Sequence, residues 1–192
     1  DTQTVDSINQ GLSPIFEPGL QAIMDRARGR LNATPDCSTA IAETDVTFII
    51  VPTPSDADGW FSNQYVLDAC EDIANGLAAK QTFHLVVIIS TVMPGSTGGK
   101  IQRQLEQLSG KICGADFGLC YAPTFVALGS VARDFLNPDY LLIGESDARA
   151  GDLLEGLYWD ICENEPVVAR MNFINAELTK LANNTFVSTK IT

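Results

Sequence analysis

The sequence has little positive charge: 12 Lys and Arg residues stand against 24 Asp and Glu residues, and the formal net charge is -12. So acidic a chain repels polyanions overall, which argues against nucleic acid and an acidic membrane surface as partners. No apolar run approaches the roughly 18 to 20 residues of a membrane span, and no signal peptide is recognisable. A small anionic ligand is not excluded, because a few local Lys, Arg and backbone N–H groups suffice to bind phosphate.

Cysteine and histidine are too few and too scattered for a metal site. The five cysteines are odd in number, form no Cys-x-x-Cys pair, and are accompanied by a single histidine, His84. We therefore predict no metal, reduced thiols and a cytoplasmic location. Cys120 follows an apolar run and is either a nucleophile or, more commonly at such a position, a buried structural thiol. We assign it no role.

Short apolar runs alternate with helical patterns. Val46 to Val51 and Leu85 to Ile89 are continuous apolar runs, as expected of strands covered on both faces. Helical spacing of apolar residues follows over 66–77, 101–108 and 153–157, and a last helix is expected to begin near residues 172–175. Weaker strand candidates are Leu31 to Thr34, Phe117 to Tyr121, Tyr140 to Ile143 and Val167 to Ala169.

This alternation predicts an α/β protein of Rossmann type, with a mostly parallel sheet, flanking helices and then the start of a long central helix. Residues 1–147 would form the Rossmann-type domain, and residues 148–192 the end of that domain and the start of the central helix. Polar residues follow both strong strands, where open α/β sheets bind their ligands. The chain begins without Met and ends without a helix stop signal, so we expect it to be part of a longer polypeptide.

Five segments, in order along nearly the whole chain, carry a resemblance to one family. Their sequences are NQGLSPIFEPGL at 9–20, DVTFIIVPTPS at 45–55, STVMPGST at 90–97, DFLNPD at 134–139 and AELTKLANNTF at 176–186. In this order and spacing they resemble the UDP-glucose/GDP-mannose dehydrogenase family.

The resemblance implies NAD as cofactor and a nucleotide-linked sugar as substrate. Family members oxidise C6 of a UDP- or GDP-sugar from alcohol to aldehyde to acid in two hydride transfers, the second through a thiohemiacetal on a Cys. The resemblance also implies a homodimer built on the central helix. The family's glycine-rich turn would lie before Asp1 and its nucleophilic Cys after Thr192, so we expect this segment alone to be inactive.

By the same resemblance, the residues that follow the two strong strands would bind NAD. Thr91 would lie near the nicotinamide and hold a water or the reacting oxygen. The alternative is that Pro52 and Pro54 merely end a strand. The candidate cofactor-binding residues are Val51, Pro52, Thr53, Pro54, Ser55, Ser90, Thr91 and Val92.

Lys180 and Asn184 are four residues apart, so on a helix both side chains point to one face. A lone Lys on a terminal helix is commonly a solvated surface charge. The resemblance implies instead that Lys180 contacts the sugar and stabilises the oxyanion that develops during oxidation, with Asn184 assisting.

The segment APTFVALGSV at 122–131 departs from the family pattern N-P-E-F-L-x-E-G-x-A, because Thr124 and Leu128 replace its two glutamates. The first glutamate is assigned to acid/base work on water in the second oxidation, and a threonine cannot act as a general base near neutral pH. A catalytically degenerate module that binds NAD or a nucleotide sugar therefore stays open. The substrate-binding candidates are Thr124, Phe125, Val126, Ala127, Leu128, Lys180 and Asn184, and the catalytic candidates are Thr91, Thr124, Lys180 and Asn184.

Overall fold

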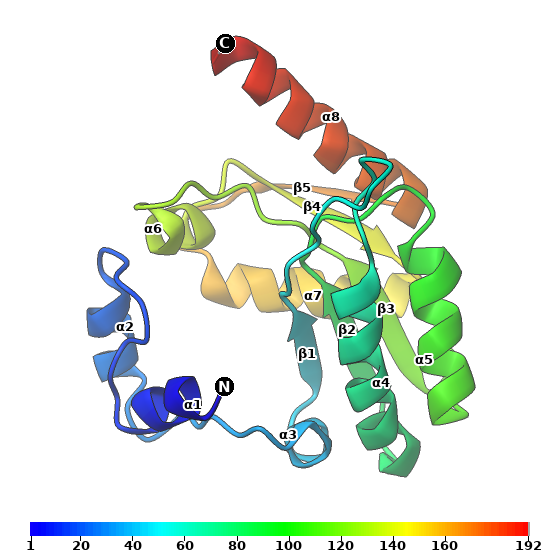
Figure 1. Ribbon diagram of the computed structural model, residues 1–192, viewed down its shortest axis with the longest axis horizontal. Coiled ribbons are helices and arrows are strands. Elements are labelled where there is room, and N and C mark those ends of the chain that lie inside the picture. The colour runs from blue at the N-terminus through cyan, green and yellow to red at the C-terminus, as the bar shows by residue number, and fades with distance from the viewer. Residues whose placement is uncertain (192) are drawn as a thin grey trace.

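In the computed structural model, which describes residues 1–191, the strands form one sheet with the order β1-β2-β3-β4-β5 (Figure 1). The strands are β1 (Val46–Ile49), β2 (His84–Ile88), β3 (Phe117–Tyr121), β4 (Tyr140–Glu145) and β5 (Val167–Met171). Neighbouring strands are parallel except β3 and β4, which pair antiparallel. The predicted α/β Rossmann-type fold with a mostly parallel sheet is confirmed.

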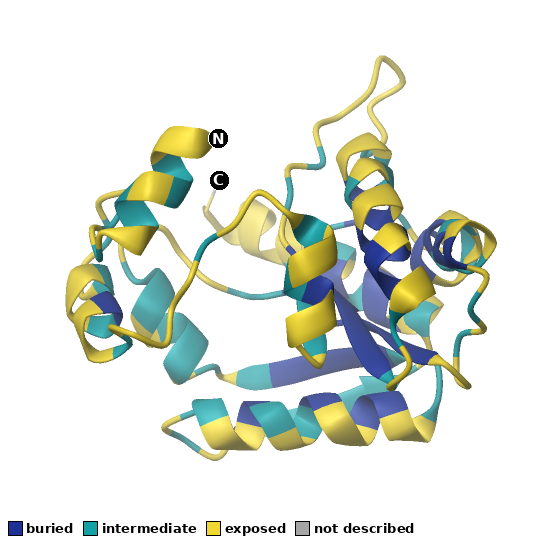
Figure 2. Ribbon diagram, turned by 90° about the horizontal axis from the view of Figure 1, so that it is seen from below, coloured by how far each residue is buried: buried dark blue, intermediate teal, exposed yellow. Residues whose placement is uncertain are grey.

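Helices cover both faces of this sheet (Figures 1 and 2). The helices α3, α4, α5 and α8 pack on one face, and α7 packs on the other. Within residues 1–191, no helix combines the length and the apolar character that a membrane crossing needs. The bounds are α1 (Thr2–Asn9), α2 (Leu20–Arg26), α3 (Cys37–Glu43), α4 (Gln64–Ala79), the π-helical η1 (Thr97–Ile101), α5 (Gln102–Ser109), α6 (Val131–Leu136), α7 (Ala148–Ile161) and α8 (Phe173–Ile191).

The core is centred on β2, whose residues are all buried. Leu85 and Val87 pack toward α7, and Val86 and Ile88 pack toward α4 and α5, because successive side chains of a strand point to opposite faces. Each such aliphatic side chain stabilises the fold by about 1.5–3 kcal/mol. Cys120 on β3 lies in the same core, and burial raises the pKa of its thiol well above the usual range, as for a structural cysteine.

The segment Leu31 to Thr34 was predicted to be a strand, and this prediction is wrong: the segment is an irregular connection between α2 and α3. The reason is a pair of hydrogen bonds from a side chain at the end of α1. The Asn9 side chain donates to the Ala33 carbonyl oxygen at 2.9 Å and accepts from the Ala33 N–H at 2.7 Å. Both backbone groups that a strand would offer to a neighbour are therefore already bonded.

The other predicted elements are confirmed. The weaker strand candidates after residue 116 became β3, β4 and β5, and the helical patterns became α4, the η1–α5 unit and α7. The last helix begins where it was expected: the Asn172 side chain accepts from the Asn175 N–H at 2.9 Å, which satisfies a free donor in the first turn of α8.

His84 is buried between β2 and the segment around β1. Its Nδ1 lies 3.0 Å from the Thr44 carbonyl oxygen, which can only accept, so Nδ1 carries the proton. Its Nε2 lies 2.8 Å from the Thr47 hydroxyl, which donates to it when the ring is neutral. Burial, with the charge of Lys80 added, lowers the pKa of His84 from its ordinary value of 6.5.

We therefore expect the free energy of unfolding to fall as the pH drops below about 6.5. The unfolded chain takes up a proton there that the folded chain resists, so this contribution to stability is complete above that pH and is lost below it. Urea denaturation of the full-length protein at pH 7, 6 and 5 would measure how the free energy of unfolding depends on pH. His84→Gln should weaken this dependence. An unchanged dependence in that variant would mean that other groups cause it.

Candidate active site

The carboxyl ends of β1 and β2 lie side by side and are joined by one serine. The Val51 N–H donates to Ser90 Oγ at 2.8 Å, and the Ser90 hydroxyl donates to the Val51 carbonyl oxygen at 2.7 Å. Ser90 is buried and its hydroxyl is fully used between the strands. Its role in this structure is to hold the two strand ends together.

The predicted cofactor-binding residues lie at this end of the sheet, where open α/β sheets bind their ligands. β1 ends at Ile49, and Pro52 has no N–H with which to resume the strand ladder, so the residues after Val51 reach the surface. These positions fit a dinucleotide lying across the strand ends, and their individual contacts with NAD stay a prediction. Pro52, Pro54 and Ser55 are exposed, Val51, Thr53 and Thr91 are half-buried, and Ser90 and Val92 are buried.

Lys180 is buried, with 8% of its surface exposed. Its Nζ donates to the Thr124 carbonyl oxygen at 2.7 Å and lies 4.3 Å from the centre of the Phe125 ring. Burial lowers the pKa of the ammonium group from its ordinary value. The alternative of a solvated surface charge is therefore wrong.

The close approach of α8 to β4 puts Lys180 in this position. Gly144 on β4 makes it sterically possible, because a Cβ atom there would lie 2.9 Å from the Ala176 Cβ and 3.3 Å from the Phe173 Cα. Neither neighbour is the flexible end of a side chain. Gly144 therefore contributes to the site through packing.

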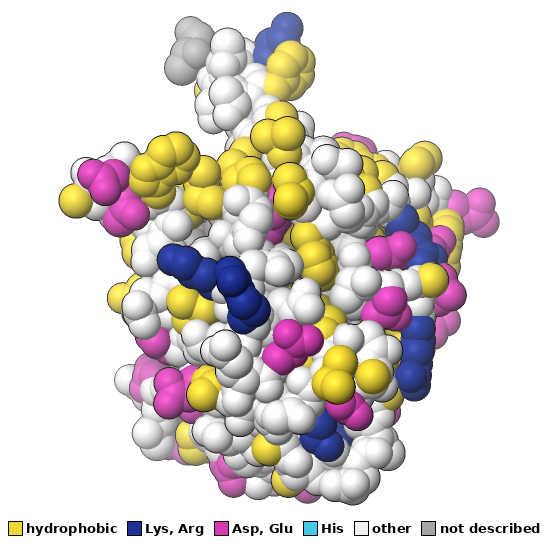
Figure 3. Space-filling view, turned by 90° about the vertical axis from the view of Figure 1, so that its right-hand side faces the viewer, with side chains coloured by type: hydrophobic (Ala, Val, Ile, Leu, Met, Phe, Trp, Pro, Cys, Tyr) yellow, Lys and Arg dark blue, Asp and Glu magenta, His cyan; other side chains and the backbone are white. Residues whose placement is uncertain are grey.

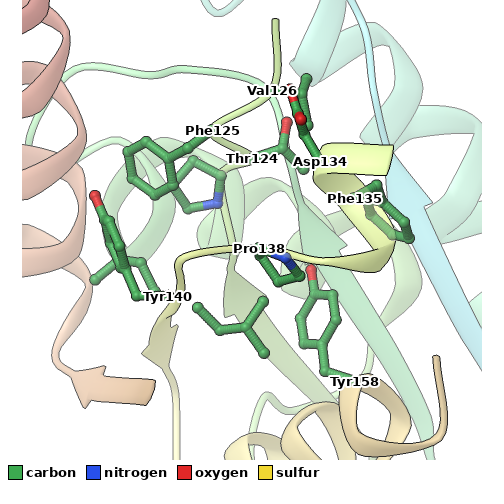
Figure 4. A pocket seen from close by; sticks show the side chains of 11 residues that line it. Thr124, Phe125, Val126, Asp134, Phe135, Pro138, Tyr140 and Tyr158 are labelled. Carbon is green, nitrogen blue, oxygen red and sulfur yellow. The ribbon is translucent and has the colours of Figure 1, made fainter. Parts of the chain in front are cut away.

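The loop from Ala122 to Ser130 follows β3 and contains the predicted substrate-binding residues Thr124 to Leu128, the first three of which are labelled in Figure 4. The Phe125 ring packs against the Tyr140 ring with centres 4.7 Å apart. The cavity below the loop offers about 20 Å³, room for about one water and not for a sugar. This cavity is therefore too small for a nucleotide sugar.

The two residues that replace the family's glutamates differ in exposure. Thr124 is half-buried beside Lys180, whereas Leu128 is 97% exposed. Val126 and Ala127 between them are also exposed. The loop thus presents backbone and apolar side chains to solvent, and no carboxylate at either position.

Asp134 on α6 orders the end of this loop. Its carboxylate accepts from the Ser130 hydroxyl at 2.6 Å and from the Ala127 N–H at 3.1 Å, and it pairs with Arg133 at 2.8 Å. The Ser130 bond, followed by the Arg133 bond, lowers the pKa of Asp134 to about 2. Asp134 lies in the DFLNPD segment and was not among the predicted site residues.

Glu177 is a functional candidate that our sequence reasoning missed. It is completely buried on α8, and its carboxylate accepts from the Gly95 N–H at 2.5 Å and from the Thr97 N–H at 2.7 Å. These two N–H groups belong to the turn that follows Thr91. Its place three residues before Lys180 in the AELTK segment was the available signal, since residues three apart share a helix face.

Asn184 lies one helical turn beyond Lys180, as predicted, but it is exposed. Within residues 1–191 its side-chain amide has no hydrogen bond, and its backbone carbonyl oxygen accepts from the Ser188 hydroxyl at 2.9 Å. The structure thus brings together Lys180, Thr124 and Phe125, whereas the Asn184 side chain is exposed and contacts none of them through a hydrogen bond within the described residues.

Glu177→Ala should lower the free energy of unfolding by about 1 to 3 kcal/mol, because it leaves the buried Thr97 N–H unpaired, whereas Gly95 is exposed and its N–H can bond to water instead. Urea denaturation of the full-length protein would measure the loss. Glu165→Ala is the matched control, because Glu165 is exposed and has no hydrogen bond within the described residues. Equal stability of the two variants would show that Glu177 does not hold the turn.

Comparisons with known proteins agree with this geometry. Residues 1–162 match the family model of the NAD binding domain of the UDP-glucose/GDP-mannose dehydrogenase family. GDP-mannose 6-dehydrogenase of Pseudomonas aeruginosa is 37% identical over 190 residues, which are 98% of this chain and 43% of that protein. UDP-glucose 6-dehydrogenase AglM of Haloferax volcanii is 37% identical over 194 residues, covering 100% of this chain and 45% of that protein.

The same relationship appears in three dimensions. A crystal structure of a ternary complex of GDP-mannose dehydrogenase from Pseudomonas aeruginosa matches with a TM-score of 0.94 and 36% identity, covering 100% of this chain and 44% of that one. The chain thus spans less than half the length of these relatives. Because the matched family model is an NAD-binding domain, NAD is the cofactor of this fold. The chain belongs to the UDP-glucose/GDP-mannose dehydrogenase family.

Proposed function

We propose that the full-length protein oxidises the C6 hydroxyl of a UDP- or GDP-linked sugar to the uronic acid in two successive hydride transfers to NAD. The observation that carries this proposal is the buried Lys180 ammonium beside the Thr124 carbonyl oxygen. A buried cation is costly unless polar groups surround it. One of its three N–H donors is bonded to Thr124, which leaves donors for an oxygen that gains negative charge.

NAD, when bound, accepts the hydride from C6. The residues of this chain then have separate tasks. Lys180 stabilises the reacting oxygen. Glu177 holds the turn that follows Thr91, and Thr91 orients water or the reacting oxygen. Thr124 has no carboxylate with which to take a proton from water, so the second oxidation is the slower one.

A catalytically degenerate module that binds NAD or a nucleotide sugar is the second candidate. Its specific support is the pair Thr124 and Leu128, neither of which can act as an acid or a base. The buried Lys180 favours the enzyme, because a cation beside the backbone of the substrate loop is a group that an alcohol oxidation needs and that binding alone does not require.

The proposal extends to the organisation of the protein. Residues 1–147 would be the NAD-binding domain, α7 and β5 its end, and α8 the start of a central helix on which a homodimer forms in the cytoplasm. The end of α8 extends beyond the rest of the molecule (Figure 3). Large apolar side chains of α8 are exposed along its length, as a subunit interface requires: Ile174, Leu178, Phe186, Val187 and Ile191.

The test is the absorbance of NADH formed by the full-length protein with UDP-glucose, UDP-N-acetylmannosamine, UDP-N-acetylglucosamine and GDP-mannose. Two NADH per sugar would establish the complete reaction and its substrate. One per sugar would mean that oxidation stops at the aldehyde. No NADH from a folded protein that binds NAD would leave the binding module as the better account.

A further inference from the structure

The N-terminal lobe, residues 1–33 with α1 and α2, lies to the side of the sheet (Figure 1). Among the hydrogen bonds and ion pairs of residues 1–191, those of this lobe stay within it except at one side chain, Glu17. The polar connection between the lobe and the rest of the fold therefore rests on a single carboxylate.

Glu17 bonds to the loop that contains the predicted substrate-binding residues. Its Oε2 accepts from the Gly129 N–H at 3.2 Å, and its Oε1 accepts from the Val131 N–H at 2.9 Å. Only a carboxylate offers two acceptor oxygens for two such donors. Gly129 has a φ of +88°, which glycine adopts without strain, and this conformation separates Leu128 from the start of α6.

Glu17 supplies an acceptor to the first turn of α6, but only one of its two bonds serves that helix. The N-cap residue of α6, Ser130, makes no side-chain capping bond, because its hydroxyl donates toward Asp134 instead. A local Ser, Thr or Asp normally supplies the acceptor at such a position. Here it comes from a residue more than a hundred positions away, and one of its two bonds is to Gly129, outside the helix.

The loop is consequently held by three side chains, of which Asp134 bonds to the Ala127 N–H and the Ser130 hydroxyl in its middle part. Lys180 binds the Thr124 carbonyl oxygen at one end, and Glu17 binds Gly129 and Val131 at the other. The exposed segment between these points is 126–128, the part that faces solvent and any sugar on the outer side of the loop.

We propose that Glu17 is a positioning residue for the nucleotide sugar: it fixes the 124–131 loop to the N-terminal lobe and so sets the backbone against which the sugar binds. The expected effect on sugar-nucleotide binding rests on the proposed function. The expected effect on the position of the loop rests on the hydrogen bonds alone. Glu17 touches the loop and acts through it.

The experiment compares Glu17→Ala and Glu17→Gln in the full-length protein, with UDP-glucose and GDP-mannose as the probes. We expect Glu17→Ala to raise the KM for the sugar nucleotide about tenfold, with a smaller change in kcat and an unchanged KM for NAD. Glu17→Gln should recover part of the loss, because its amide oxygen still accepts one bond. Asp6→Ala is the matched control, since Asp6 is exposed on the same lobe and its side chain has no hydrogen bond within residues 1–191.

Hydrogen exchange of the Gly129 and Val131 amides tests the role of Glu17 in holding the loop without requiring that the protein be an active dehydrogenase. Faster exchange in Glu17→Ala than in Asp6→Ala supports the inference even if the wild-type protein oxidises neither probe. Unchanged exchange would overturn it. In an active protein, a KM for the sugar nucleotide equal to that of Asp6→Ala would overturn it as well.

Discussion

Lys180→Ala is expected to lower kcat of the full-length protein by about 10²- to 10³-fold, the range observed when one preorganised donor to a developing oxyanion is removed. The variant loses a buried ammonium that is already held by the Thr124 carbonyl oxygen and the Phe125 ring. The predicted NAD-binding residues lie at the ends of β1 and β2, so the KM for NAD should stay unchanged. Initial rates of NADH formation at saturating substrate would measure the effect.

The matched control is Lys100→Ala. Lys100 is exposed on η1 and its side chain has no hydrogen bond within residues 1–191, so its removal changes the net charge equally without touching the loop. If kcat of Lys180→Ala equals that of the control, Lys180 is not a catalytic residue. A thermal melt of both variants would check that each is folded.

Thr124→Glu should accelerate the second oxidation by about 10²- to 10⁴-fold, the usual contribution of a positioned general base. Position 124 is half-buried and its backbone carbonyl oxygen accepts from the Lys180 ammonium, so a glutamate side chain there would lie near a cation that favours its ionised form. Trapping of the aldehyde in the wild-type reaction, and its disappearance in the variant, would show the change together with the NADH formed per sugar.

Thr124→Gln is the control for Thr124→Glu, because glutamine has nearly the same size and cannot take a proton. Faster aldehyde oxidation in both variants would mean that side-chain size, and not basicity, had limited the reaction. A wild-type protein that already forms two NADH per sugar at the rate of Thr124→Glu would show that another group performs this task.

The sheet could be predicted from the sequence mainly through two runs of β-branched and aliphatic residues, Val46 to Val51 and Leu85 to Ile89. The second run is buried as expected, whereas β1 is an edge strand of the described sheet and is mostly half-buried. The same criterion failed at Leu31 to Thr34. That segment is short, Leu31 is 47% exposed, and the Asn9 side chain bonds both polar groups of Ala33.

The site could be predicted only in part, because its defining bonds join residues far apart in sequence. The spacing of Lys180 and Asn184 placed both on one helix face, but it contained no information that α8 would bury one and expose the other. The bonds of Glu177 to Gly95 and Thr97, and of Glu17 to Gly129, span about 80 to 112 positions. The spacing of residues within one helix or strand cannot predict hydrogen bonds between residues so far apart in sequence.

The position of two charged side chains on α8 also determines how the site can move. Glu177 holds the turn behind Thr91, and Lys180 holds the loop at Thr124, from neighbouring turns of one rigid helix. A slide of α8 by a single residue, about 1.5 Å along its axis, would stretch both sets of bonds together. Neither loop can therefore open through a movement of α8 while the other stays closed, and any force applied to the exposed end of this helix acts on both halves of the site at once.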